Sequence, residues 1–537
     1  MILENRRATI NIFNAHDYQK RDFAKLISNL FQFFTFIVFF AFLFDIWRNS
    51  PSIILTHDVS DFIAESNQFL IDGTLYSSFF NINPPFLIFF YVLWGSLLGF
   101  GLFGLKTLNI ILITAIFFIF YRILLKYGQK SFILIVFNIG VALAYTRNAF
   151  QMFLPSESIG TLMALVLLYL SLRGFEKLIW LVPVGILSAL SMQTKEVYAF
   201  TILTPILVCL FYQKRRYVKL SVLLSSFLGT NLILMFLLYL FGELDSYLDV
   251  INLKSHSFRP SDWKNTLLTS VVMIHRQFQF FGEIFAVFCI LLAILGFYKN
   301  RKNADVKFSD YSKRRSFFYF ICTAVNWLAI SIGIIWQRKD FTNGHVIITV
   351  LFPFLLFAYF GLAYLFNSLD FKGIQLNLSL LFIILPIIYT IYSNGNHLQT
   401  GITDQELNRN LRNYTLVKNL ELSSNDCIQN AYGWMSGSAY LYTGMKPCSR
   451  YFLINLIVND KSRLDEFRST MVSHPPRAII YDNSGADLNW KEFERKIFPY
   501  SIALKECYLN IEKSDVYLAK WPNNIQRECL KNIIRDN

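Results

Sequence analysis

An acidic polar segment at residues 56–85 interrupts the very apolar N-terminal half of the chain. It carries Asp58, Asp61, Glu65 and Asp72 and almost no bases. A carboxylate beside a bilayer is costly unless it is solvated, paired or used in a reaction, so these acids mark a candidate site. The alternative is a solvated loop whose acids simply avoid the membrane.

Cationic residues fill two short turns between later apolar runs. Arg338, Lys339 and His345 lie in one turn, and Lys195 precedes Glu196 in another. A phosphate at a membrane surface needs charge-assisted donors, and Arg can bind it through two parallel hydrogen bonds. Both turns therefore predict phosphate contacts. The alternatives are general attraction to lipid headgroups for the first turn and, for Lys195, a side chain that snorkels to water.

The composition indicates a membrane protein. The chain has 537 residues, of which 54% are hydrophobic and only 16% charged. Apolar runs of the roughly 20 residues that a span needs recur through residues 1–393. The net charge of +14 lies in short basic clusters between these runs, which argues against nucleic-acid binding. The N-terminal run at 30–44 has no small-residue cleavage site after it and predicts a retained signal anchor.

We expect about eleven membrane helices, and up to thirteen, in a first domain of residues 1–393. The expected spans are 28–47, 107–121, 131–146, 159–173, 178–193, 197–212, 219–241, 279–297, 316–336, 346–367 and 376–393. The glycine-rich run 86–104 is expected to re-enter or lie on the surface as a pair of short helices, because a full span would put the later basic clusters outside. A double crossing would leave the later topology unchanged. The N-terminus is then cytoplasmic and the C-terminus outside.

From residue 394 the chain turns polar, and residues 394–537 are long enough for one domain. Strand-like runs at 478–481 and 516–519 alternate with helix-like stretches at 461–472 and 490–497, which predicts a small soluble α/β domain outside the membrane.

The seven cysteines divide between the two parts of the chain. Those in apolar runs are expected to be small core residues: Cys209, Cys289 and Cys322. Those in the polar part could form two disulfides, in three pairings, if that part is exported: Cys427, Cys448, Cys507 and Cys529.

The acidic segment resembles the first outer loop of the GT-C glycosyltransferases, here residues 48–84. The resemblance lies in Asp58, Phe62 four residues on, Gly73 with Tyr76, and the Pro84-Pro85 pair. These multi-spanning enzymes include the protein O-mannosyltransferases and the aminoarabinose transferases of lipid A, and they take sugars from polyprenyl-phosphate carriers. The resemblance implies that Asp58 is the catalytic acid or base.

Three later segments resemble the same superfamily. Glu157 stands where a second acid opens a helix after an upstream Arg, here Arg147, and would partner Asp58 in sensing the acceptor or holding a cation. The alternative for Glu157 is an acid favoured by the dipole at a helix N-terminus. Thr194-Lys195 matches a Thr-Lys at the same turn in the superfamily. The basic pair before His345, followed by Pro353, matches a pattern of bases, then His or Tyr, then Pro.

These features predict an integral membrane glycosyltransferase, similar to glycosyltransferase family 39, on the outer (periplasmic) face of a bacterial plasma membrane. It would move a hexosyl or pentosyl group from a polyprenyl-phosphate donor to a glycan, lipid or protein. Asp58 would act as general base, worth about 100- to 10,000-fold. Arg338, Lys339, Lys195 and His345 would stabilise the leaving phosphate. His57 and Asp61 are further candidates, and inversion at the sugar is implied by the family.

A divalent cation, Mg or Mn, could bind between Asp58 and Glu157, since hard cations favour carboxylate oxygen. However, Val59 stands where the superfamily often has a second adjacent acid.

The rival interpretation is a transporter or flippase of lipid-linked sugars. That class more often shows internal repeats and charges in mid-span, whereas the spans here are nearly free of charge. A third interpretation is a membrane-anchored receptor. It explains the polar C-terminal part but not the acidic segment.

Overall fold

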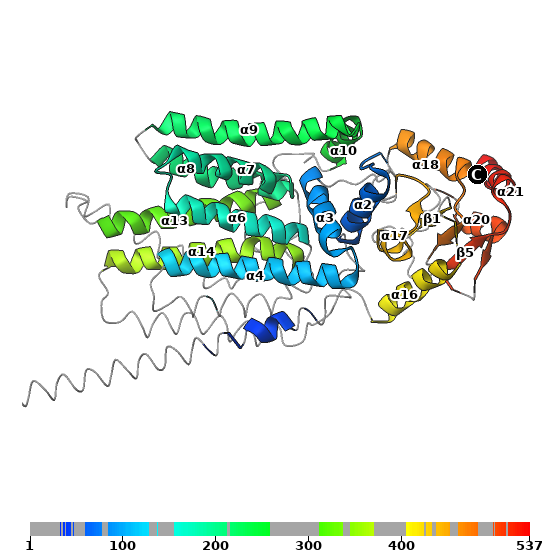
Figure 1. Ribbon diagram of the computed structural model, residues 1–537, viewed down its shortest axis with the longest axis horizontal. Coiled ribbons are helices and arrows are strands. Elements are labelled where there is room, and N and C mark those ends of the chain that lie inside the picture. Colours follow the sequence, from blue (N-terminus) through cyan, green and yellow to red (C-terminus); the bar gives the residue numbers. More distant parts are fainter. Residues whose placement is uncertain are drawn as a thin grey trace, which may run out of the picture.

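The computed structural model is mostly helical, with a small sheet near its C-terminus (Figure 1). The structure describes residues 33, 36–37, 39–44, 47, 59–77, 84–127, 137, 155–211, 215–257, 311–336, 344–369, 404–420, 422–423, 426–431, 437–451, 460–481, 498, 500–511 and 514–536.

Every expected apolar run that falls within the described residues is helical. The main helices run side by side in a bundle (Figure 1). They are α4 (Leu102–Tyr127), α6 (Pro155–Arg173), η1 (Leu178–Trp180), α7 (Leu181–Met192), η2 (Glu196–Ile202), α8 (Leu203–Phe211), α9 (Arg216–Leu240), α13 (Tyr311–Trp336) and α14 (Gly344–Leu369). The expected spans 279–297 and 376–393, and 131–146 apart from Phe137, lie outside the described residues.

Four described helices are long and apolar enough to cross a membrane: Phe103–Tyr127, Ser156–Arg173, Arg216–Leu240 and Ser316–Ile334. Helix α9 lies at the edge of the bundle (Figure 1) and turns large apolar side chains outward; Leu232 is 68% exposed and Ile233 62%. An apolar surface of this extent is unusual on a protein surrounded by water.

The segment 86–104 forms one short helix and the start of the next. Helix α3 (Pro85–Leu98) has 14 residues, fewer than the roughly 20 that a span needs. The chain turns at Gly99, whose φ of +75° lies in the left-handed region that favours glycine, and α4 begins at Leu102. The indole of Trp94 then donates a hydrogen bond of 3.1 Å to the carbonyl of Gly104, which ties α3 to α4. The expected pair of short helices is therefore a single short helix.

The C-terminal part is an α/β domain whose sheet has five strands in the order β2-β1-β3-β5-β4 among the described residues. Strand β1 pairs in parallel with β2 and β3, and β5 pairs antiparallel with β3 and β4. The expected runs correspond to β3, β5 and α18, while 490–497 lies outside the described residues. The described elements of the C-terminal domain are α16 (Asp404–Asn419), β1 (Cys427–Asn430), α17 (Gly437–Thr443), β2 (Lys446–Pro447), α18 (Lys461–Ser473), β3 (Ala478–Ile480), α20 (Tyr500–Cys507), β4 (Tyr508–Asn510), β5 (Val516–Ala519) and α21 (Asn523–Asp536).

Two disulfides select one of the three pairings that the sequence left open. Cys427–Cys448 joins β1 to the residue after β2, and Cys507–Cys529 joins the end of α20 to α21. Cys209 and Cys322 are free and buried, as expected for core residues, and Cys289 lies outside the described residues.

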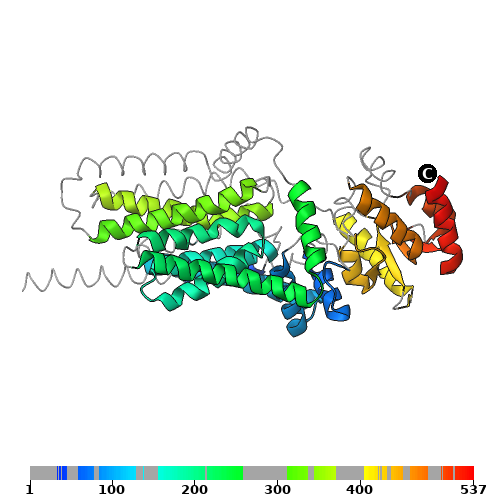
Figure 2. The same ribbon diagram turned by 90° about the horizontal axis from the view of Figure 1, so that it is seen from above.

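Two helices outside the bundle connect it to this domain. Helix α2 (Val59–Asp72) packs against α17. Helix α10 (Leu244–Ser257) follows α9 and stands between the bundle and the domain (Figure 2, green). Arg463 of α18 forms ion pairs with Asp249 of α10 and with Asp460, the N-cap of α18. The domain is therefore docked on the end of the bundle where α2 and α10 lie.

We expect peptide mapping without reduction to recover Cys427 linked to Cys448 and Cys507 linked to Cys529. Replacing the second pair by Cys507→Ser and Cys529→Ser should lower the free energy of unfolding of the C-terminal domain by about 3 kcal/mol, because the disulfide constrains the unfolded chain. The control is Cys209→Ser, which alters a free thiol. A linkage between the two pairs, such as Cys427 with Cys507, would contradict this fold.

Candidate functional site

Three helix starts meet at the end of the bundle that faces the C-terminal domain. The Tyr198 hydroxyl of η2 donates a hydrogen bond of 2.7 Å to the carbonyl of Glu157, in the first turn of α6. The same hydroxyl lies 3.4 Å from the Thr349 hydroxyl, in the second turn of α14. His345, the second residue of α14, precedes Thr349 by about one helical turn. The expected residues Glu157, Lys195 and His345 therefore belong to one end of the bundle.

An ion pair between Glu157 and Lys195 lies at the centre of this end. The Lys195 ammonium contacts Oε1 of Glu157, and the Ser156 hydroxyl donates to Oε2. The Glu157 side chain is 2% exposed and that of Lys195 13%. Because removing one member of a buried pair leaves an uncompensated charge, this contact holds the start of α6 against the start of η2.

Close backbone packing brings the end of α13 to the same place. A Cβ on Gly333 would collide with the carbonyl oxygen of Val197 in η2. Helix α13 ends at Trp336, one turn beyond this contact. Arg338 and Lys339, which follow α13 in the sequence, lie outside the described residues. The end of α13 before them and the start of α14 after them both lie at this end of the bundle.

Glu243 anchors the stretch that follows α2. Its buried carboxylate accepts hydrogen bonds from the backbone N–H groups of Leu75, at 3.0 Å, and Ser77, at 2.9 Å, and from the Ser77 hydroxyl. Hydrogen bonds to an ionised acceptor are stronger than neutral ones. Glu243 is not among the site residues that the sequence predicts, although an acid directly after a long apolar run and Gly242 is a usable signal.

Tyr76 links this anchored stretch to the Lys195 turn. The phenol is fully buried, and burial raises its pKa well above the ordinary value, with further contributions from the negative charges of Glu65, Glu196 and Glu243. Glu196 directly follows Lys195. The acidic segment and the Lys195 turn therefore influence each other electrostatically although they are far apart in the sequence.

Charge separates the two ends of the bundle. At the site end, which we call the acidic end, carboxylates predominate among the described residues: Asp61, Glu65, Asp72, Glu157, Glu196, Glu243, Asp245 and Asp249. At the other end, the basic end, Tyr127 packs against Tyr169 and Tyr319, with ring centroids 6.0 and 5.0 Å apart. Apart from Glu176, the charged residues near that end are mostly bases among the described residues: Arg122, Lys126, Arg173, Lys177, Arg215, Arg216 and Lys219.

One acid of α2 lies near the C-terminal domain. Asp61 is 2% exposed and lies near the C-terminal domain. Burial raises the pKa of Tyr414 to about 12, and the Asp61 carboxylate adds to this rise. Asp58 immediately precedes α2; it lies outside the described residues, as do His57 and Arg147.

The expected metal site between Asp58 and Glu157 gains no support from Glu157. Both of its carboxylate oxygens are engaged, one by Lys195 and one by Ser156. Within the part of the chain that the structure describes, no group of three or more His, Cys, Asp or Glu side chains could hold a metal ion. We therefore derive no step through a metal.

No known family model matches this chain, and a comparison with curated proteins gives no match either. The resemblance to the GT-C glycosyltransferases therefore rests on the residues of the acidic segment and of the three later segments named above.

We expect Gly333→Ala to lower the midpoint of thermal unfolding in detergent, because the added methyl group would force α13 away from η2. Overpacking of this kind costs about 1–3 kcal/mol. Gly229→Ala is the matched control, since a Cβ there meets nothing within 4 Å and alanine favours the helix. Equal midpoints for the two variants would show that α13 and η2 are not in close contact.

The Glu157–Lys195 pair is testable by a double-mutant cycle on the free energy of unfolding. Glu157→Gln alone should cost about 3 kcal/mol, because Lys195 is left without its partner, and adding Lys195→Met should recover at least roughly 1 kcal/mol. The exposed pair Glu528–Lys531, 4.0 Å apart, is the control and should show a coupling below about 1 kcal/mol. Additive effects of the two buried changes would contradict the ion pair.

Proposed function

We propose that the protein is an integral membrane glycosyltransferase that uses a polyprenyl-phosphate sugar as donor. The observation that carries this proposal is the convergence at the acidic end of the bundle. The Glu157–Lys195 pair, the start of α14 and the stretch anchored by Glu243 meet there, beside α2, which begins directly after Asp58.

The membrane part of the proposal is supported by three features of the bundle. Four described helices are long and apolar enough to span a bilayer, and α9 exposes large apolar side chains. The basic end is rich in Lys and Arg, which membrane proteins keep on the cytoplasmic side. We infer that the acidic end and the C-terminal domain face the outside of a bacterial plasma membrane. Disulfides in that domain agree with an oxidising compartment.

The proposed reaction is one displacement at the anomeric carbon. Asp58 takes the proton from an acceptor hydroxyl or amine as the acceptor oxygen or nitrogen forms a bond to that carbon. The bond from the carbon to the phosphate oxygen breaks, and polyprenyl phosphate leaves as an anion. Cations that face the leaving phosphate stabilise the developing charge. Arg338, Lys339 and Lys195 are the candidates for this role.

The ion pair changes the role that we propose for Glu157. Its carboxylate holds the Lys195 ammonium at the end of the bundle, so Glu157 acts as a positioning residue and not as a second catalytic acid. An incoming phosphate would share the ammonium with Glu157. The Lys195 side chain is 13% exposed, whereas that of Glu157 is 2% exposed.

The direct test is to incubate the purified protein with a panel of polyprenyl-phosphate sugars and candidate acceptors and to score release of the carrier phosphate. Release with at least one donor, together with a glycosylated acceptor, supports the proposal. A protein that moves the intact donor across a vesicle membrane without releasing carrier phosphate is a flippase, and that result would overturn the proposal.

Asp58→Asn should reduce the transfer rate by about 100- to 10,000-fold, because the amide cannot accept the proton, while expression stays at the wild-type level. Asp465→Asn, an exposed change on α18, is the matched control and should keep its activity. Transfer that survives in Asp58→Asn would remove Asp58 from the mechanism.

A further inference from the structure

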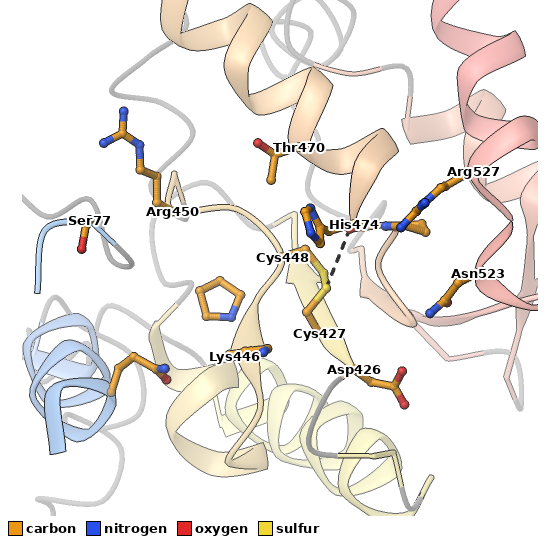
Figure 3. A pocket seen from close by; sticks show the side chains of 13 residues that line it. Ser77, Asp426, Cys427, Lys446, Cys448, Arg450, Thr470, His474, Asn523 and Arg527 are labelled. Atoms are coloured by element: carbon orange, nitrogen blue, oxygen red, sulfur yellow. Dashed lines mark hydrogen bonds between the residues drawn. A yellow bond between two sulfur atoms is a disulfide. The ribbon is translucent and has the colours of Figure 1, made fainter. Parts of the chain in front are cut away.

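The C-terminal domain has a cavity of about 400 Å³ at the β2 edge of its sheet (Figure 3). Its walls come from the strands β1 and β2, the end of α18 and the start of α21. Two residues from outside the domain complete it, Gln68 of α2 and Ser77. Because Glu243 holds Ser77 in place, the cavity lies where the domain meets the acidic end of the bundle.

The lining of this cavity is positively charged. Lys446, Arg450 and Arg527 contribute cations, and Asp426 is the one carboxylate among the lining residues. The Arg450 guanidinium is shared with Glu466, with nitrogen–oxygen distances of 2.9 and 3.0 Å. Lys446 and Arg527 have no ion-pair partner among the described residues. They are therefore available to an anion that enters the cavity.

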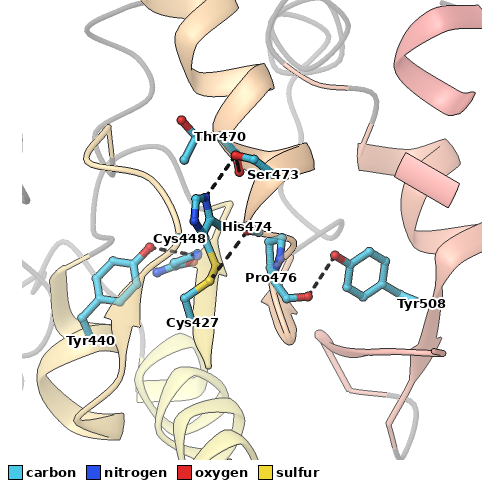
Figure 4. Close-up of a disulfide and its surroundings, with 9 residues drawn as sticks. Cys427, Tyr440, Cys448, Thr470, Ser473, His474, Pro476 and Tyr508 are labelled. Carbon is cyan, nitrogen blue, oxygen red and sulfur yellow. Dashed lines mark hydrogen bonds between the residues drawn. A yellow bond between two sulfur atoms is a disulfide. The ribbon is translucent and has the colours of Figure 1, made fainter. Parts of the chain in front are cut away.

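The base of the cavity is rigid. The Cys427–Cys448 disulfide joins β1 to the residue after β2, and Sγ of Cys427 lies 3.8 Å from the carbonyl oxygen of His474 (Figure 4). The His474 ring has its Nδ1 atom 3.0 Å from the Ser473 hydroxyl. Figure 3 shows His474, Arg527 and Asn523 grouped around this disulfide. The disulfide and the contact with Ser473 therefore fix His474 relative to β1.

Helix α21 adds a second attraction for an anion. Its first residue, Asn523, lines the cavity. The first backbone N–H groups of a helix have no acceptor within the helix, and the helix dipole adds partial positive charge there. Together with the side chains of Lys446 and Arg527, this end of α21 suits an oxyanion.

We propose that this cavity binds an oxyanion, a phosphate or a carboxylate, carried by a saccharide. The volume exceeds that of a bare phosphate and lies in the range of small-molecule sites, roughly 300–1,000 Å³. Uncharged polar side chains also line the cavity, among them Gln68, Thr470 and Asn523, and offer hydrogen bonds to sugar hydroxyls. If the proposed function holds, the ligand is an anionic part of the acceptor, kept beside the acidic end of the bundle.

The test is a binding titration of the full-length protein in uncharged detergent. The probes are glucose 1-phosphate and glucuronic acid, with glucose as the neutral comparison. Saturable binding of at least one charged probe, much tighter than that of glucose and weakened by salt, is expected. The double variant Lys446→Gln and Arg527→Gln should weaken binding by about tenfold or more, because each cation provides a charge-assisted contact.

The matched control is Lys531→Gln, which removes a charge from α21 outside the cavity and should leave binding unchanged. The substituted side chains are exposed in each variant, so equal unfolding midpoints would confirm that the fold is retained. The proposal is overturned if neither charged probe binds, if glucose binds equally well, or if the double variant binds like the wild type.

The oxyanion could also come from a lipid headgroup. Titration in discs of phosphatidylcholine, with and without phosphatidylglycerol, separates the two sources. If phosphatidylglycerol displaces the probe, and this displacement requires Lys446 and Arg527, the cavity is a lipid site. That result would refute the proposal of a saccharide ligand. Binding of a charged probe by a protein that shows no sugar transfer would support the cavity and refute the proposed function, so the two failures can be told apart.

Discussion

The buried ion pair between Glu157 and Lys195 is the interaction on which the acidic end of the bundle depends. Neither charge can be left alone in a weakly polar interior without a large cost, so the starts of α6 and η2 stay together. Tyr198 then joins α14 to this pair through Thr349 and the carbonyl of Glu157. Three chain segments that are distant in the sequence are thereby positioned by one electrostatic requirement.

A second buried acid performs the same task for the segment outside the bundle. Glu243 binds backbone N–H groups on either side of Tyr76 and holds that stretch at the end of α9. Helix α10 continues from there and reaches the C-terminal domain through the Asp249–Arg463 ion pair. These contacts set the position of the cavity at the β2 edge, because Ser77 both binds Glu243 and lines the cavity.

Much of the helical architecture could be predicted from the sequence, because apolar runs are a local signal. The strands β3 and β5 were equally visible, whereas β1, β2 and β4 are short or polar and gain their pairing only from the sheet. The Glu157–Lys195 contact could not be predicted, because it joins residues 38 positions apart through the packing of η2 against α6. The disulfide pairing and the clamp by Glu243 likewise depend on tertiary structure. The single short helix α3 depends on a turn at Gly99, which was hard to locate because three other glycines lie nearby in the sequence.

The proposed reaction requires the Asp58 carboxylate and the Arg338 guanidinium to share the acidic end of the bundle. The most direct measurement is the distance between spin labels at Asp58→Cys and Arg338→Cys, in a chain that carries Cys209→Ala, Cys289→Ala and Cys322→Ala and keeps its disulfides. A shared end predicts a distance below about 25 Å. A distance of roughly 39 Å or more, the length of a 26-residue helix such as α13, would put the two groups at opposite ends and contradict the account.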